Sequence, residues 1–142
     1  DESAEEKETE EAISGDEFEA LTARFKEVLG DRVENVRESK ILTDSPARLV
    51  NPADAMNVNM QRVQRLLGKD YEVPRKILEV NRKNALIQSL STRLAANADD
   101  PLINPLIEQL YANELVTEGL HPNPAEMVDR IYELMDAAAT SK

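Results

Sequence analysis

DDPLINPLIEQLYANELVTEGLHPNPAEMVDRIYELM, residues 99–135, predicts two consecutive amphipathic helices. Apolar residues recur in both halves at steps of three and four, the spacing that lines one face of a helix. Asp100-Pro101 and Asn123-Pro124 each place a capping side chain before a first-turn proline, which marks a helix start. Gly119 and Pro122 indicate that the first helix ends before the second begins.

The apolar faces of these two helices look too broad to cover each other. Two antiparallel helices leave part of their apolar surface open to water, whereas four such helices close a bundle. One interpretation is therefore a homodimer interface. The alternative is a helical hairpin packed on its own domain, since most apolar helix stripes are intramolecular core. The dimer interpretation places at the interface Ile103, Leu106, Ile107, Leu110, Tyr111, Val128, Ile131, Tyr132, Leu134 and Met135.

Composition fits one domain of ordinary size. The 142 residues contain 41% hydrophobic residues, no cysteine and no Trp. Without cysteine there is no disulfide and no thiolate chemistry, which suits a reducing compartment, so we expect a cytoplasmic protein. No apolar run approaches the roughly eighteen residues of a membrane span. Because the chain opens with Asp1 inside an acidic stretch, we expect it to be part of a longer protein.

The net charge of −11 is unevenly distributed. Residues 1–20 hold ten acids and one base, whereas residues 62–93 hold eight bases and three acids. The acidic residues 1–15 are typical of a disordered linker end. The basic segment supports an alternative function, a monomeric acidic adaptor that binds an anionic partner through residues 62–93. Nucleic acid is disfavoured as that partner, because aromatic residues make up only 4% of the chain.

The remaining elements predict an α+β fold. Ser14 and Glu17 form a capping box before a helix that ends at Gly30. Short segments at 33–42, 46–51 and 75–80 are typical of strands, and helices are expected at 52–67 and from a cap at Asn81 to about residue 94. The prediction is a small three-stranded sheet covered by helices, with a mixed α/β part at 16–100 and a helical segment with a short frayed tail at 101–142.

Residues suited to catalysis are few. His121 is the only histidine, and its place between the two terminal helices favours a structural or solvent-facing loop residue. Asp99 and Asp100 are better explained as helix-capping acids than as a catalytic pair. Gly68-Lys69 lacks the upstream glycine of a phosphate loop. We therefore assign no catalytic, cofactor-binding or metal-binding residue, and an enzyme is the weakest alternative.

Four separate segments, in this order and spacing, resemble a known family. They are KILTDSPARLV at 40–50, LEVNRKNALI at 78–87, LYANELVTEGL at 110–120 and NPAEMVDRIYELM at 123–135. Together they resemble the C-terminal domain of the heat shock protein 90 chaperones, in the bacterial HtpG form, over about residues 16–138. The resemblance implies a homodimer in which the last two helices of each protomer form a four-helix bundle.

The resemblance also bears on function. It implies a role in protein folding and the stress response, with ATP and magnesium bound by an N-terminal domain outside this chain. The full-length protein would then be an ATPase, whereas this chain would be no enzyme and hold no cofactor. The expected partners are a second copy and unfolded or partly folded client proteins, with no nucleic acid and no membrane.

The segment 52–67 carries a methionine-bearing stripe. Its members are Met56, Met60, Val63 and Leu67. Periodicity alone favours packing of this stripe on the sheet, although flexible methionine side chains also suit a surface that adapts to several partners. The resemblance implies an amphipathic helix exposed in the dimer cleft that contacts clients. The polar Gln64 stands where the family has an apolar residue.

Overall fold

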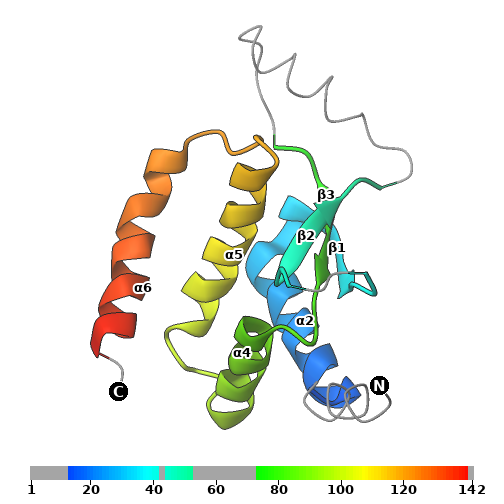
Figure 1. Ribbon diagram of the computed structural model, residues 1–142, viewed down its shortest axis with the longest axis vertical. Helices are drawn as coiled ribbons and strands as arrows, with labels where there is room; N and C mark the ends of the chain where they lie inside the picture. Colours follow the sequence, from blue (N-terminus) through cyan, green and yellow to red (C-terminus); the bar gives the residue numbers. More distant parts are fainter. Residues whose placement is uncertain (1–12, 42–43, 53–72, 141–142) are drawn as a thin grey trace, which may run out of the picture.

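The computed structural model describes residues 13–41, 44–52 and 73–140. Within these residues the chain forms a three-stranded sheet and four α-helices, which confirms the predicted α+β class (Figure 1). The elements are α2 (Gly15–Leu29), η1 (Gly30–Arg32), β1 (Val33–Glu38), β2 (Ala47–Val50), β3 (Lys76–Val80), α4 (Ala85–Ala96), α5 (Ile103–Thr117), η2 (Pro124–Met127) and α6 (Val128–Thr140). The helix predicted at 52–67 lies outside the described residues, apart from Pro52.

Helix α2 forms as its sequence predicts. The Ser14 hydroxyl accepts a hydrogen bond from the Glu17 backbone N–H at 3.2 Å and donates one to the Glu17 carboxylate at 3.1 Å. These bonds make a capping box, which satisfies a backbone donor that the first turn leaves unpaired. Gly30 ends the helix at φ 58°, a left-handed conformation that favours glycine.

The sheet has the order β1-β3-β2, with β1 parallel and β2 antiparallel to the central β3. Leu78 of β3 is fully buried on the core face and lies opposite Val36 and Leu49. Glu79 accepts hydrogen bonds from Arg37 and Arg48 at 2.9 and 2.8 Å. Because successive side chains of a strand point to opposite faces, this cluster ties the three strands together on the side away from Leu78.

The cap of α4 differs from the prediction. Asn84, not Asn81, caps the helix, and its side chain accepts from the Leu86 N–H at 2.9 Å. Asn81 is buried, and its amide donates instead to the Ser45 carbonyl at 3.1 Å. Both asparagines precede the apolar run, but the Asn81 side-chain oxygen accepts from the Lys83 N–H at 3.1 Å, in the turn before the helix.

The predicted starts of the two terminal helices are also adjusted. Helix α5 begins at Ile103, because Asp100 accepts from the Leu102 N–H and holds a turn before the helix. Gly119, at φ 72°, ends α5 in a Schellman motif, with the Leu120 N–H bonded to the Leu115 carbonyl at 2.8 Å. After Asn123 the chain forms the short 3₁₀ helix η2 before α6.

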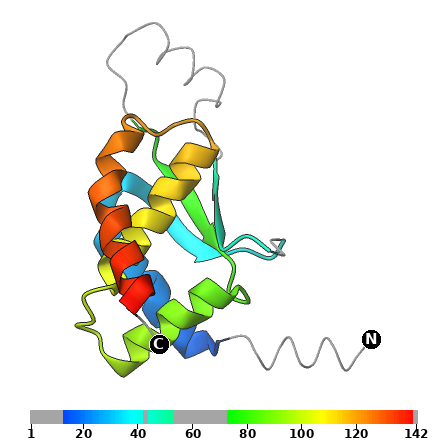
Figure 2. The ribbon, with the colours of Figure 1, turned by 60° about the vertical axis from the view of Figure 1, so that its left-hand side comes forward.

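The helices lie in layers beside the sheet. Helix α2 contacts β1, α5 contacts β2, and both of these helices contact α4. Helix α6 packs on α5 and η2, at the margin of the molecule and on the side of α5 away from the sheet (Figures 1 and 2). This position makes α6 the most peripheral described helix.

Candidate interaction surface on the terminal helices

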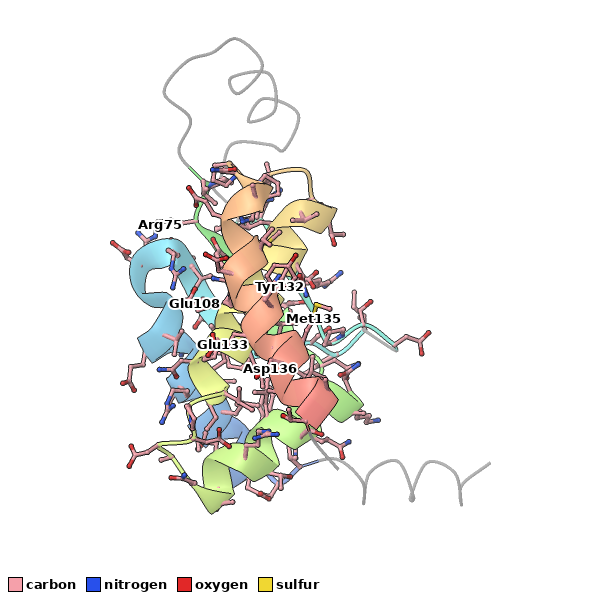
Figure 3. The ribbon with its side chains drawn as sticks, turned by 90° about the vertical axis from the view of Figure 1, so that its left-hand side faces the viewer. Arg75, Glu108, Tyr132, Glu133, Met135 and Asp136 are labelled. Carbon is pink, nitrogen blue, oxygen red and sulfur yellow. The ribbon has the colours of Figure 1, made fainter. Side chains whose placement is uncertain are left out.

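Helix α6 contributes no buried residue to the fold. Val128, Tyr132 and Met135 are 42%, 64% and 58% exposed, and Ile131 beside them is half-buried. These four residues, which we call the α6 stripe, follow helical spacing along one side of the helix. Figure 3 shows Tyr132 and Met135 on that side and Glu133 on the other. An apolar stripe that its own chain leaves uncovered marks a surface suited to another protein.

Helix α5 places most of its predicted interface residues elsewhere. Ile103, Ile107, Leu110 and Tyr111 are buried in the core cluster of the chain itself, so their assignment to a surface between protomers does not fit this structure. The Arg32 guanidinium also lies over the Tyr111 ring, with 5.7 Å between the guanidinium carbon Cζ and the centre of the ring. Intramolecular packing therefore covers these four side chains.

Other α5 and α6 residues stay accessible to a partner. Leu106 and Leu134 are half-buried. Val116, which is not among the predicted interface residues, is exposed. The surface that the structure leaves available is therefore the α6 stripe, with a narrower contribution from α5.

A polar link joins α5 to η2 and α6. The Gln109 side-chain oxygen accepts from Arg130 Nε at 3.0 Å, and its amide nitrogen donates to Asn113 Oδ1 at 2.8 Å. The same nitrogen lies 3.5 Å from the sulfur of Met127. Gln109 is only 9% exposed, so this polar side chain is buried with its bonds made. Sequence periodicity gave no sign of this role.

A cavity of about 400 Å³ lies between α5 and the η2–α6 segment. On its lining, Arg32 makes a bidentate ion pair with Glu108 at 2.7 and 2.8 Å. His121 also lines it and is buried, so it is structural rather than solvent-facing, and its Nδ1 accepts from the Asn123 backbone N–H at 3.1 Å. Within the described residues no group of three or more acidic or histidine side chains is placed to hold a metal ion.

Two carboxyl groups of this region have shifted pKa values. The Leu102 N–H, and then Arg93, hold the pKa of Asp100 below its usual range, in agreement with the turn-capping role. On α5, burial and, to a lesser extent, the neighbouring Glu118 carboxylate raise the pKa of Glu114 to about 7. Glu114 is thus a half-buried acid whose surroundings disfavour the ionised carboxylate.

The described part of the basic segment 62–93 makes internal contacts. Arg93 pairs with Asp100 at 2.9 Å. Arg75 lies 3.7 Å from Glu34, and Arg82 lies 3.7 Å from Glu38. Lys76 is buried and bonds to Asn51. Three of the eight basic residues of this segment are thus paired with acids of the same chain, which does not favour the adaptor alternative. The basic residues from 62 to 72 lie outside the described residues.

The structure does not test the predicted client contact. The proposed client-contacting residues Met56, Met60, Val63 and Leu67 lie outside the described residues. Of the helices that the structure describes, none has the length and apolar character needed to cross a membrane.

Comparison with known proteins gives a consistent family match. The family model described as Hsp90 protein matches residues 1–142. Similar proteins named chaperone protein HtpG occur in Chlorobium phaeovibrioides, 38% identical over 99% of this chain and 22% of the relative, and in Nitratidesulfovibrio vulgaris, 41% identical over 84% and 19%. The HtpG of Desulfitobacterium hafniense is 38% identical over 96% of this chain and 21% of the relative. The chain spans about a fifth of the length of these relatives.

Proposed function

Since the chain belongs to the Hsp90 protein family, we propose that it is the C-terminal dimerisation domain of an ATP-dependent, HtpG-type chaperone that assists protein folding under stress. In this proposal the α5–α6 pair packs against the same pair of a second copy and forms a four-helix bundle. One observation carries it: α6 presents an apolar stripe and buries none of its residues in its own chain.

The driving force is the removal of the α6 stripe from water. Apolar surface contributes about 25 cal/mol for each Å² buried, and aromatic residues and methionine are enriched at protein interfaces. Tyr132 and Met135 are such residues and are more than half exposed. A twofold arrangement would let the same stripe serve as both halves of the contact.

The mechanism is positional. A stable link between two C-terminal domains raises the effective concentration of the attached domains for one another, so their closure becomes nearly intramolecular. In the proposed full-length protein those attached domains bind ATP and magnesium. This chain would contribute the link rather than the ATPase chemistry.

We propose client contact as a second role, for the segment 52–67. Support comes from the sequence, because Met56, Met60, Val63 and Leu67 recur at steps of four, three and four and methionine adapts to varied apolar partners. Replacement of Met56 and Met60 by aspartate in the full-length protein should weaken suppression of client aggregation. Unchanged suppression would contradict this second role.

The dimer proposal is tested with the double variant Tyr132→Asp/Met135→Asp. Sedimentation equilibrium over a dilution series should show a dimer for the parent chain and a monomer for the double variant. Both side chains are exposed in the single chain, so its circular dichroism should stay unchanged. Ile41→Asp and Leu86→Asp, which alter exposed apolar residues outside α5 and α6, are matched controls and should remain dimeric. A dimeric double variant would refute the proposed interface.

A further inference from the structure

Gln109 is an unusual residue for its position. It is 9% exposed and lies among apolar neighbours on α5, yet its amide is fully engaged. Its oxygen accepts from Arg130 Nε at 3.0 Å and its nitrogen donates to Asn113 Oδ1 at 2.8 Å. One bond crosses to α6 and the other stays within α5. Gln109 therefore fixes the position of Arg130 relative to α5.

Among the residues that the structure describes, few other hydrogen bonds or ion pairs hold helix α6. The core cluster contains none of its residues, and its apolar contacts with α5 are made by half-buried side chains such as Ile131 and Leu134. Apolar contact is non-directional and tolerates rotation or sliding of a peripheral helix. A hydrogen bond to a charged donor requires a defined distance and angle, and a buried amide left unpaired is costly.

The rotation of α6 decides which side chains face outward. Val128 and Tyr132 lie one turn apart on the α6 stripe, whereas Asp129 and Glu133 follow them directly on the acidic side. Successive helical residues are separated by about 100° around the axis. A modest rotation of α6 would therefore exchange part of the apolar surface for carboxylates.

We propose that Gln109 is a specificity-determining positioning residue of the dimer. Through Arg130 it fixes the rotation of α6 on α5 and presents the α6 stripe, rather than the acidic side, to the second copy. Buried polar residues set register and oligomeric state in other helical assemblies in the same way. The inference rests on the proposed dimerisation function and adds the residue that controls its geometry.

Gln109→Leu is the primary variant, because leucine is similar in size but cannot accept from Arg130. We expect the dissociation constant of the dimer to rise about tenfold, the effect of losing one charge-assisted hydrogen bond. Gln109→Glu keeps an acceptor for Arg130 and should restore the parent dissociation constant to within about threefold. Asn104→Leu is the matched control on α5. It removes the acceptor of the 3.1 Å hydrogen bond from Arg24 of α2, a bond that does not involve α6, and should leave the dissociation constant unchanged.

A second measurement separates this inference from the dimer proposal. The chain has no cysteine, so spin labels at Thr117→Cys and Ala138→Cys report the α5–α6 distance without background labelling. In the Tyr132→Asp/Met135→Asp background we expect a narrow distance distribution, broadened by Gln109→Leu and not by Asn104→Leu. A distribution that stays narrow in Gln109→Leu overturns the inference. A parent chain that is monomeric at all concentrations refutes the dimer instead, while the label distances still decide the role of Gln109.

Discussion

Helix α5 buries seven of its fifteen residues in the body of the chain, whereas α6, thirteen residues long, buries none. Both helices carry apolar residues at steps of three and four. Tyr111 of α5 is buried, with Arg32 against its ring, while Tyr132 of α6 is largely exposed. Of two neighbouring amphipathic helices, α5 thus belongs to the hydrophobic core and α6 lies outside it.

The difference shows what an apolar stripe can and cannot indicate. It identifies the face of a helix that avoids water, but not whether the covering surface belongs to the same chain. The sheet and α2 cover α5. Nothing in the described residues covers the α6 stripe to the same extent. A second copy is therefore proposed for α6, and α5 serves mainly as its support.

The largest expected effect tests the α5 side of this contrast. Ile107→Ala removes a fully buried side chain and should lower the free energy of unfolding by about 2–5 kcal/mol. Ile131→Ala on α6 should cost less than about 1 kcal/mol, because its side chain is only half-buried in one chain. Urea denaturation of both variants in the Tyr132→Asp/Met135→Asp background measures the two values. Equal losses would contradict the assigned difference between the helices.

The next effect tests whether the α6 stripe is covered by association. Binding between folded copies stabilises them by mass action, so the Tm of the parent chain should rise with protein concentration. A tenfold increase corresponds to about 1.4 kcal/mol for the dimer, which is a shift of a few degrees for a domain of this size. Differential scanning calorimetry at several concentrations should show this shift for the parent and Ile41→Asp. The Tyr132→Asp/Met135→Asp variant should lack it, and a shift that persists there would argue for a different interface.

The contrast between α5 and α6 also marks how far the sequence could predict this molecule. Features formed within a few residues were predicted correctly, as in the Ser14 capping box and the stop at Gly30. Asn84 rather than Asn81 caps α4, and the amide groups of both side chains donate to the distant carbonyls of Asp44 and Ser45, which no local pattern reports. The same limit applies to Gln109, since its place between Glu108 and Leu110 gives no sign that Arg130, beyond the turn after α5, will bond to it.

A smaller effect concerns pH and the acids of the two helices. Folding raises the pKa of Glu114 from an ordinary 4.5 to about 7, so the folded chain keeps a proton that the unfolded chain releases. The contribution of Glu114 to the free energy of unfolding is therefore most favourable below pH 4.5, and it is lost as the pH rises through about 7. Glu114→Gln should raise Tm at about pH 8 relative to the parent and change it less at about pH 5.

The matched control for this pH effect is Glu133→Gln on the exposed side of α6. It removes the same charge without changing the buried surroundings of Glu114, and should leave the pH dependence of Tm as in the parent. Thermal unfolding in the Tyr132→Asp/Met135→Asp background separates these effects from dimerisation. A Glu114→Gln variant with the parent pH profile would show that burial of this acid does not govern the stability of α5.

The smallest effect is the response of the dimer to salt. The α6 stripe is apolar, and the acids Asp129, Glu133 and Asp136 lie exposed on the remainder of the helix. In the proposed dimer, salt would screen the repulsion between two such acidic helices, and an apolar interface would contain no ion pair for salt to weaken. From about 0.05 M to about 0.5 M NaCl the dissociation constant should therefore change by less than about threefold, towards tighter association. Glu133→Gln should reduce this tightening, because fewer charges remain to be screened. A dissociation constant that rises tenfold or more with salt would indicate an ion-paired interface, and the uncovered α6 stripe would then not be its centre.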